Sequence, residues 1–143
     1  MTPQRVTLIT LGVDDLERAK AFYAAMGWTP TREIEGQVVF YQMHGSALGF
    51  FSRAGLAKEQ HRPVSELGTG AMTLAQNMTS REEVDTTYAR AIAAGATPLA
   101  EPAEMAWGGY SSYYADPDGH VWETAHNPFW TLNPDGSLTL DPN

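Results

Sequence analysis

The sequence predicts an α+β fold built from two βαβββ modules, and three observations lead to it. The 143-residue chain is 43% hydrophobic and 18% charged, which is typical of one folded domain and excludes a disordered or collagen-like chain. Each half contains a strand-like stretch, a capped helix and further strand-like stretches. Finally, Gly27-Trp28-Thr29-Pro30 after the first helix recurs as Gly95-Ala96-Thr97-Pro98 after the second, which indicates an internal repeat.

The first module is expected over residues 5–52. It opens with a strand at 6–12, where β-branched and apolar residues alternate. Asp14-Asp15-Leu16-Glu17 is a capping-box pattern, so the sequence predicts a helix with Asp14 as its N-cap and Gly27 at its end. Three more strands are predicted at residues 28–35, 38–43 and 47–52.

Residues 53–70 form a connector, with a short helix expected around residues 57–61. The second module, residues 71–127, starts with a strand at 71–77 and a helix from the Ser80 capping box to Gly95. A loop at 101–109 and the turn Asp116-Pro117-Asp118-Gly119 separate three strands, at 97–100, 110–115 and 121–126. Residues 128–143 form a tail whose Phe129 and Trp130 we expect to dock on the domain or on a partner subunit. All of this is expected to be one domain, 1–143.

Composition narrows the function classes. The net charge is -8 and there is no cluster of Lys or Arg, which disfavours nucleic acids and anionic membranes as partners. The chain has no cysteine, so any metal would need His, Asp or Glu ligands. No stretch reaches the length of a membrane span and the start lacks a signal-peptide pattern, so we expect a cytoplasmic protein.

The two βαβββ units, the helix Asp-Leu-Glu-Arg-Ala-Lys-Ala-Phe-Tyr-Ala-Ala-Met-Gly-Trp at 15–28 and the ending Asp-Pro-Asp-Gly-His-Val-Trp-Glu at 116–123 together resemble the vicinal oxygen chelate superfamily. This grouping includes glyoxalase I, bleomycin-resistance proteins and extradiol dioxygenases. The resemblance covers roughly residues 6–128. It implies a mixed sheet that curls around a concave cleft for a ligand, and it implies a homodimer.

The resemblance also implies one metal-ligand position on each of the first, fourth, fifth and eighth strands. In chain order these positions hold Leu8 or Thr10, Gly49 or Phe51, Thr73 or Ala75, and Glu123. A single carboxylate does not hold a catalytic metal, so we expect no metal and no other cofactor. An unconventional site from His44, His61 or His126 remains open as an alternative, although their spacing does not favour it.

Glu123 is the candidate catalytic residue, as a general base or as a hydrogen-bond acceptor; as the alternative, it is a packing or salt-bridge residue. Trp107, beside Gly108-Gly109, is a candidate lid residue. The candidate ligand-binding residues are Thr10, Tyr41, Phe51, Thr73, Asn77, Trp107 and Tyr113. Threonines are also ordinary strand residues, and about half of the aromatic side chains should belong to the core.

The sequence therefore predicts a glyoxalase/bleomycin-resistance-like protein that binds a small organic molecule in an aromatic cleft without the superfamily's metal ligands. It would be a binding protein or a metal-independent enzyme. One alternative is a metal-dependent lyase, isomerase or dioxygenase with non-standard ligands. Another is an interaction module whose cleft has collapsed. The expected partners are a small molecule and a second copy of the chain.

Overall fold

The computed structural model describes residues 1–141, so Pro142 and Asn143 of the expected tail lie outside the described part. The chain divides into two units, Met1–Thr69 and Gly70–Asn143. Each unit contains one βαβββ module with a four-stranded mixed sheet, so the predicted fold class and the duplication are confirmed.

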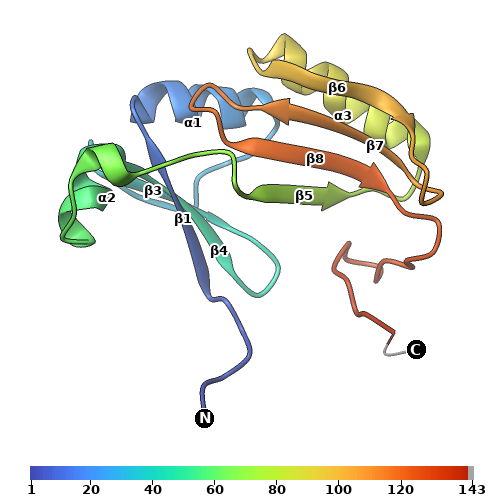
Figure 1. The fold of residues 1–143 in the computed structure, drawn as a ribbon, viewed down its shortest axis with the longest axis horizontal. Coiled ribbons are helices and arrows are strands. Elements are labelled where there is room, and N and C mark those ends of the chain that lie inside the picture. The colour runs from blue at the N-terminus through green and yellow to red at the C-terminus, as the bar shows by residue number, and fades with distance from the viewer. Residues whose placement is uncertain (142–143) are drawn as a thin grey trace. The chain divides into compact units, whose positions relative to one another are not determined.

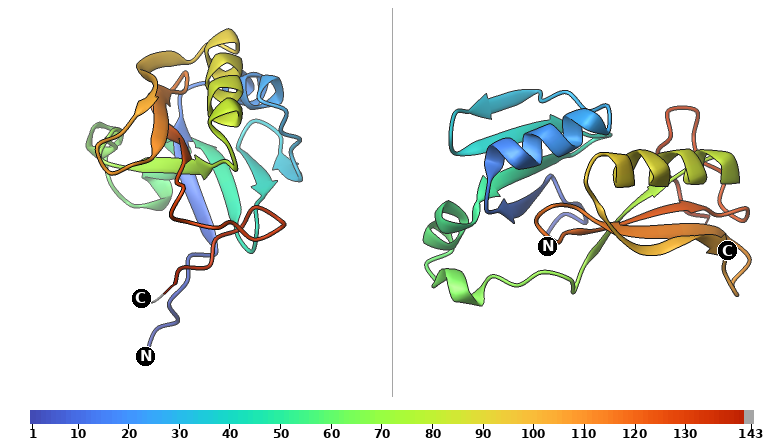
Figure 2. Two further views of the ribbon diagram at one scale, coloured as in Figure 1. Left: turned by 90° about the vertical axis from the view of Figure 1, so that its right-hand side faces the viewer. Right: turned by 90° about the horizontal axis from the view of Figure 1, so that it is seen from above.

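The first unit has its strands in the order β1-β4-β3-β2 (Figure 1). β1 runs parallel to β4, and the β4–β3 and β3–β2 pairs are antiparallel. The strands are β1 (Leu8–Val13), β2 (Arg32–Ile34), β3 (Val38–Gln42) and β4 (Ala47–Ser52). Helix α1 (Leu16–Ala25) lies against one face of this sheet (Figure 2) and buries Ala19, Phe22 and Tyr23.

The second unit repeats this arrangement with the strand order β5-β8-β7-β6. β5 is parallel to β8, while β8–β7 and β7–β6 are antiparallel. The strands are β5 (Thr73–Asn77), β6 (Thr97–Glu104), β7 (Tyr110–Ala115) and β8 (Val121–His126). Helix α3 (Arg81–Ala93) covers one face of the sheet, with Val84 and Ala91 buried against the strands (Figure 1).

The two helices end in the same way, which gives the repeated glycines a physical reason. Gly27 and Gly95 have φ angles of 94° and 109°, where a residue with a Cβ is strained. After each glycine the next amide donates to a carbonyl five residues back, Trp28 to Tyr23 at 2.9 Å and Ala96 to Ala91 at 3.0 Å. Both ends are therefore Schellman motifs.

Both helices start with a side-chain N-cap, as predicted, but the N-cap residue of α1 is shifted by one position. Ser80 caps α3 as predicted, since its hydroxyl accepts from the Glu83 amide at 3.1 Å. The predicted N-cap of α1 is wrong by one residue: Asp15, not Asp14, accepts from the Arg18 amide at 3.0 Å. Asp14 instead faces Arg53, with the closest nitrogen and oxygen 3.4 Å apart.

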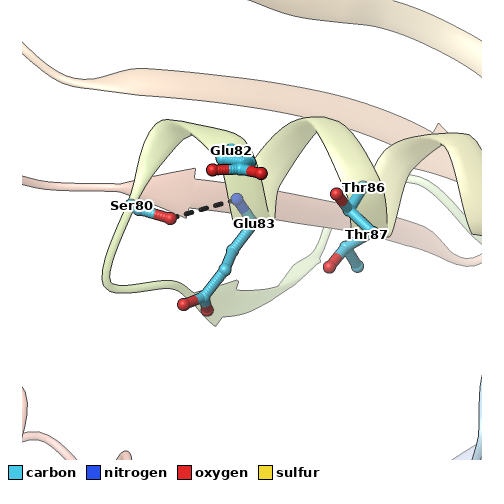
Figure 3. A pocket seen from close by; sticks show the side chains of 5 residues that line it. All are labelled: Ser80, Glu82, Glu83, Thr86 and Thr87. Atoms are coloured by element: carbon cyan, nitrogen blue, oxygen red, sulfur yellow. Dashed lines mark hydrogen bonds between the residues drawn. The ribbon is translucent and has the colours of Figure 1, made fainter.

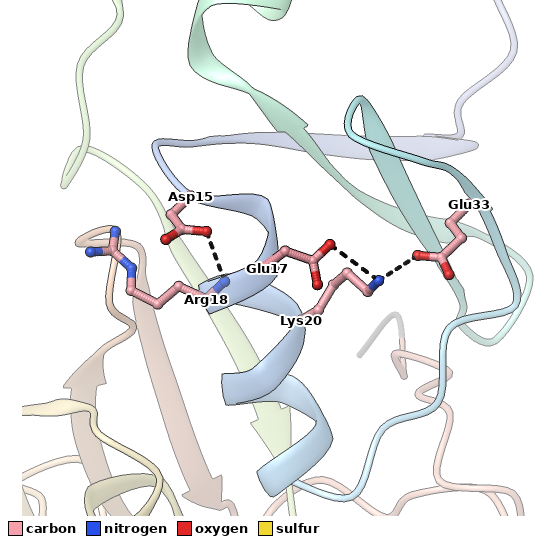
Figure 4. A network of polar contacts seen from close by, with 5 residues as sticks. All are labelled: Asp15, Glu17, Arg18, Lys20 and Glu33. Atoms are coloured by element: carbon pink, nitrogen blue, oxygen red, sulfur yellow. Dashed lines mark hydrogen bonds and ion pairs between the residues drawn. The ribbon is translucent and has the colours of Figure 1, made fainter.

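Lys20 ties α1 to the edge strand β2 (Figure 4). Its ammonium group lies 2.8 Å from the Glu33 carboxylate and 3.5 Å from that of Glu17 on the same helix. The hydrogen bond to Glu33 is the largest cause that raises the pKa of Lys20. Because both carboxylates are exposed and Lys20 is only half-buried, the contact contributes little to stability.

Several predicted boundaries are wrong. β1 was predicted at 6–12 and is Leu8–Val13, and β5 was predicted from residue 71 and starts at Thr73. β2 is shorter than 28–35 because its first residues belong to the helix end and to Pro30. The connector helix, α2 (Arg53–Glu59), starts earlier than 57–61 because the Ser52 hydroxyl caps it at the Gly55 amide, and a short 3₁₀ helix follows at Val64–Glu66. β6 extends through the expected loop to Glu104 despite two prolines, since it is an edge strand with shifts in its register.

The tail leaves the end of β8 and runs on the side of the second sheet away from α3 (Figures 1 and 2). Phe129 is 72% exposed and Trp130 is 45% exposed, so these rings are not buried as anchors in this chain. No helix within residues 1–141 is both long and apolar enough to span a membrane.

Candidate functional site

The strand register of the second sheet gathers four of the predicted residues on one face. Glu123 pairs with Tyr113 on β7 and with Ala75 on β5. Thr73 and Asn77 lie two residues on either side of Ala75 and therefore point to the same side of the sheet. We call this side the Glu123 face and define it by Thr73, Ala75, Asn77, Ser111, Tyr113 and Glu123.

The opposite face belongs to the core under α3. Tyr114 and Trp122 are buried there, and burial, followed by the charge of Asp116, raises the pKa of Tyr114 to about 12. His126 lies on this face too, since it pairs with Tyr110, and its ring is 3.1 Å from the Met78 carbonyl oxygen. The register thus separates His126 from Glu123.

Glu123 and Tyr113 are the interacting pair of the Glu123 face. Both side chains are half-buried. Burial is the largest cause that raises the pKa of Tyr113, and a hydrogen bond to Glu123 and the charge of its carboxylate raise it further. The phenol therefore stays protonated at neutral pH and serves as a hydrogen-bond donor next to the carboxylate.

This pairing predicts a measurable effect of Glu123→Gln. Removing the negative charge should lower the pKa of Tyr113, but burial should keep it above its ordinary value. NMR titration of ¹³C-labelled tyrosine rings would measure it. Tyr114, which faces α3, is the internal control and should titrate unchanged. An unaltered Tyr113 titration in the variant would show that the two groups do not interact.

Polar and small side chains on β5 adjoin the pair. Thr73 and Ala75 are exposed and Asn77 is half-buried. The Thr73 hydroxyl and the Asn77 amide therefore lie on either side of the Ala75 methyl group, beside Glu123. This part of the face can donate to and accept from a bound molecule.

The first unit contributes two candidates, Thr10 and Phe51, on one face of its own sheet. Both are half-buried, and the register places Gly49, two residues before Phe51 on β4, between Thr10 on β1 and Phe40 on β3. A Cβ on Gly49 would lie 3.1 Å from the Phe40 ring. Phe40, which the sequence analysis missed, thus fills the space beside Gly49.

Tyr41 is placed differently from the other candidates. It lies on the helix-covered face of the first sheet, is 2% exposed, and its ring is 5.7 Å from that of Phe50. The structure thus places the Tyr41 ring in the core under α1 and apart from Thr10 and Phe51, and its predicted ligand-binding role stays a prediction.

Trp107 lies in the loop between β6 and β7 and is 48% exposed. Its indole ring lies over Gly109, where any Cβ would overlap it, and the Phe129 ring lies against Gly108. The glycines are thus needed for close approach of two rings. Trp107 belongs to the second unit and is outside the paired rows of the Glu123 face.

A hollow of about 300 Å³ lies along the start of α3 (Figure 3). Ser80, Glu82, Glu83, Thr86 and Thr87 line it. Polar groups of Ser80 and Glu83 are used within the helix start itself. The Ser80 hydroxyl accepts from the Glu83 amide, and the Thr79 hydroxyl donates to the Glu83 carboxylate at 2.7 Å. It contains none of the predicted site residues.

Two βαβββ units with these sheet orders define a class of α+β proteins with the glyoxalase-like fold. The chain matches the family model of the Glyoxalase/Bleomycin resistance protein/Dioxygenase superfamily over residues 5–124. It therefore belongs to this superfamily. No curated protein matches the chain significantly.

Several solved structures are similar. A glyoxalase-related enzyme from Fulvimarina pelagi is 37% identical, with a TM-score of 0.90 and coverage of 96% of this chain and 99% of that one. A lactoylglutathione lyase from Agrobacterium tumefaciens is 25% identical, with a TM-score of 0.70 and coverage of 92% and 100%. A glyoxalase/bleomycin resistance protein/dioxygenase from Nocardioides is 25% identical, with a TM-score of 0.73 and coverage of 88% and 85%.

The register pairs the residues that the resemblance places at the metal-ligand positions. Among the candidate positions, Thr10 pairs with Gly49 and Ala75 pairs with Glu123. These four residues offer one carboxylate and no imidazole, whereas Zn, Ni, Fe or Mn sites of this type need several such ligands. Within residues 1–141, no group of three or more His, Cys, Asp or Glu could hold a metal ion.

Sequence reasoning missed two residues of the Glu123 face that carry no catalytic motif. Ala75 was considered only as a possible metal-ligand position, and Ser111 was not among the candidate residues. Ser111 is buried next to Ala125, and its hydroxyl has no hydrogen-bond partner in the described part of the chain. The alternation of β7 from Tyr113 was the signal that placed it on this side.

Proposed function

We propose that this protein binds a small organic molecule on the Glu123 face, with the Glu123 carboxylate as its main polar contact and without a metal ion. The observation that carries the proposal is the setting of Glu123. It is a half-buried carboxylate in the middle of β8, with a phenol on one side and an exposed methyl group on the other. Such a carboxylate accepts a ligand hydrogen bond or acts as a general base.

The donor set supports the metal-independent part of the proposal. Direct hydrogen bonding by Glu123 needs no second ligand, whereas metal chemistry needs several donors. Superfamily membership supports a small organic ligand. The descriptions of the family and of one similar structure name bleomycin and lactoylglutathione, which makes these two compounds suitable first probes.

The test is an NMR titration of the ¹⁵N-labelled protein with bleomycin, with lactoylglutathione and with a library of small polar fragments. Binding should shift the amide signals of β5, β7 and β8. Glu123→Gln should weaken the affinity for the best-binding compound by about 10- to 100-fold, because a hydrogen bond to a charged group is worth about 1.5–3 kcal/mol. Glu82→Gln on α3 is the matched control and should bind normally.

Three results would contradict the proposal. The first is that no compound shifts these signals, and the second is that Glu123→Gln binds as the unmodified protein does. The third is a stoichiometric, tightly held transition metal in protein purified without added ions, which would favour a metal-dependent lyase, isomerase or dioxygenase with non-standard ligands. A homodimer and a cytoplasmic location remain predictions, to be checked by light scattering and by fractionation.

A further inference from the structure

A row of cross-strand pairs that includes Glu123 extends over all four strands of the second sheet. Register places Ala100 opposite Tyr113, Tyr113 opposite Glu123, and Glu123 opposite Ala75. Side chains paired in this way have Cβ atoms about 5 Å apart. Glu123 thus has a large aromatic neighbour toward β7 and a methyl group toward β5.

On the β7 side of Glu123 the register places the large side chain of Tyr113, whose hydroxyl interacts with the carboxylate. On the β5 side the exposed Ala75 projects only one carbon atom above the sheet. Thr73 and Asn77 bound this space along the strand, each about 7 Å from Ala75.

We propose that the ligand reaches Glu123 from the β5 side, over Ala75, and that Ala75 determines which ligands fit. This inference rests on the proposed function. The group that lies over Ala75 donates an O–H or N–H to the free part of the carboxylate. Ala75, Ala100 and Tyr113 supply no positive charge along the row, so a neutral or cationic donor is favoured over an anion.

The size of the side chain at position 75 should therefore control the affinity for the ligand, whereas the size of the side chain at position 100 should not. Ala75→Leu should weaken binding of the best compound from the fragment titration at least tenfold. Ala100→Leu is the matched control, because Ala100 is an equally exposed alanine in the same row but lies beyond Tyr113. It should change affinity less than twofold.

Each outcome is informative. Equal effects of Ala75→Leu and Ala100→Leu, while Glu123→Gln still weakens binding, would overturn the approach over Ala75 and leave the proposed function standing. If Glu123→Gln has no effect, or no compound binds, the proposed function and this inference both fail. Should Ala75→Leu fold poorly by circular dichroism, Ala75→Val, which suits a strand, replaces it and should weaken binding about three- to tenfold.

Discussion

Replacing Phe50 by alanine should lower the free energy of unfolding of the first unit by about 3–5 kcal/mol. Phe50 is 0% exposed on β4. Its ring stacks on Tyr23 of α1 with centroids 4.6 Å apart and meets Tyr41 edge-on. The substitution removes the ring that joins the helix to the sheet and leaves a cavity between them. Urea denaturation followed by NMR signals of both units measures the loss.

Phe51→Ala is the matched control for this prediction. Phe51 is the next residue on the same strand, so it points to the other face, where it is half-buried and lies against Gly55. Its loss should cost about half as much as that of Phe50, since less apolar area is buried. Equal costs would mean that the helix-covered face is not the core of the first unit.

Replacing Asp116 by alanine should destabilise the second unit by about 2–4 kcal/mol, because it leaves amide groups without an acceptor. Asp116 is 2% exposed in the turn between β7 and β8. Its Oδ1 accepts from the amides of Asp118 and His120, both at 2.9 Å. Thermal unfolding measures the cost, and hydrogen exchange at residues 116–120 locates it.

Asp116→Asn distinguishes the hydrogen bonds from the mere presence of a side chain. Asparagine keeps one carbonyl oxygen in the position of Oδ1, so it should recover at least half of the lost stability. A variant as unstable as Asp116→Ala would show that the negative charge, and not the acceptor geometry, supports the turn.

Local sequence signals predicted most of the fold. The bounds of β4, β7 and β8 agree with the strand-like stretches predicted between clear turn residues. The Asp-Pro-Asp-Gly motif forms a turn, as its residues favour. The errors have physical causes. β6 was predicted too short because its prolines, Pro98 and Pro102, are not expected inside a central strand. Proline is tolerated at a sheet edge, where β6 lies.

The candidate site was predicted less completely. Glu123 was recognisable from the resemblance, because it ends the Asp-Pro-Asp-Gly-His-Val-Trp-Glu motif at 116–123. The sequence did not show which face Tyr41 would occupy, because four consecutive residues of β3, Val38 to Tyr41, are hydrophobic or aromatic and alternation does not tell the two faces of this strand apart. Ala75 gave no signal by itself, since its importance comes from its cross-strand partner.

The prolines and register shifts of β6 also bear on whether copies of the protein can pair through this edge strand. An edge strand with a regular row of amides and carbonyls is a template for a foreign strand. Along β6, two positions lack an amide hydrogen, and the ladder shifts between Pro98 and Ala100 and again before Ala103. A strand approaching this edge finds no continuous partner, so β6 discourages the stacking of sheets into fibrils.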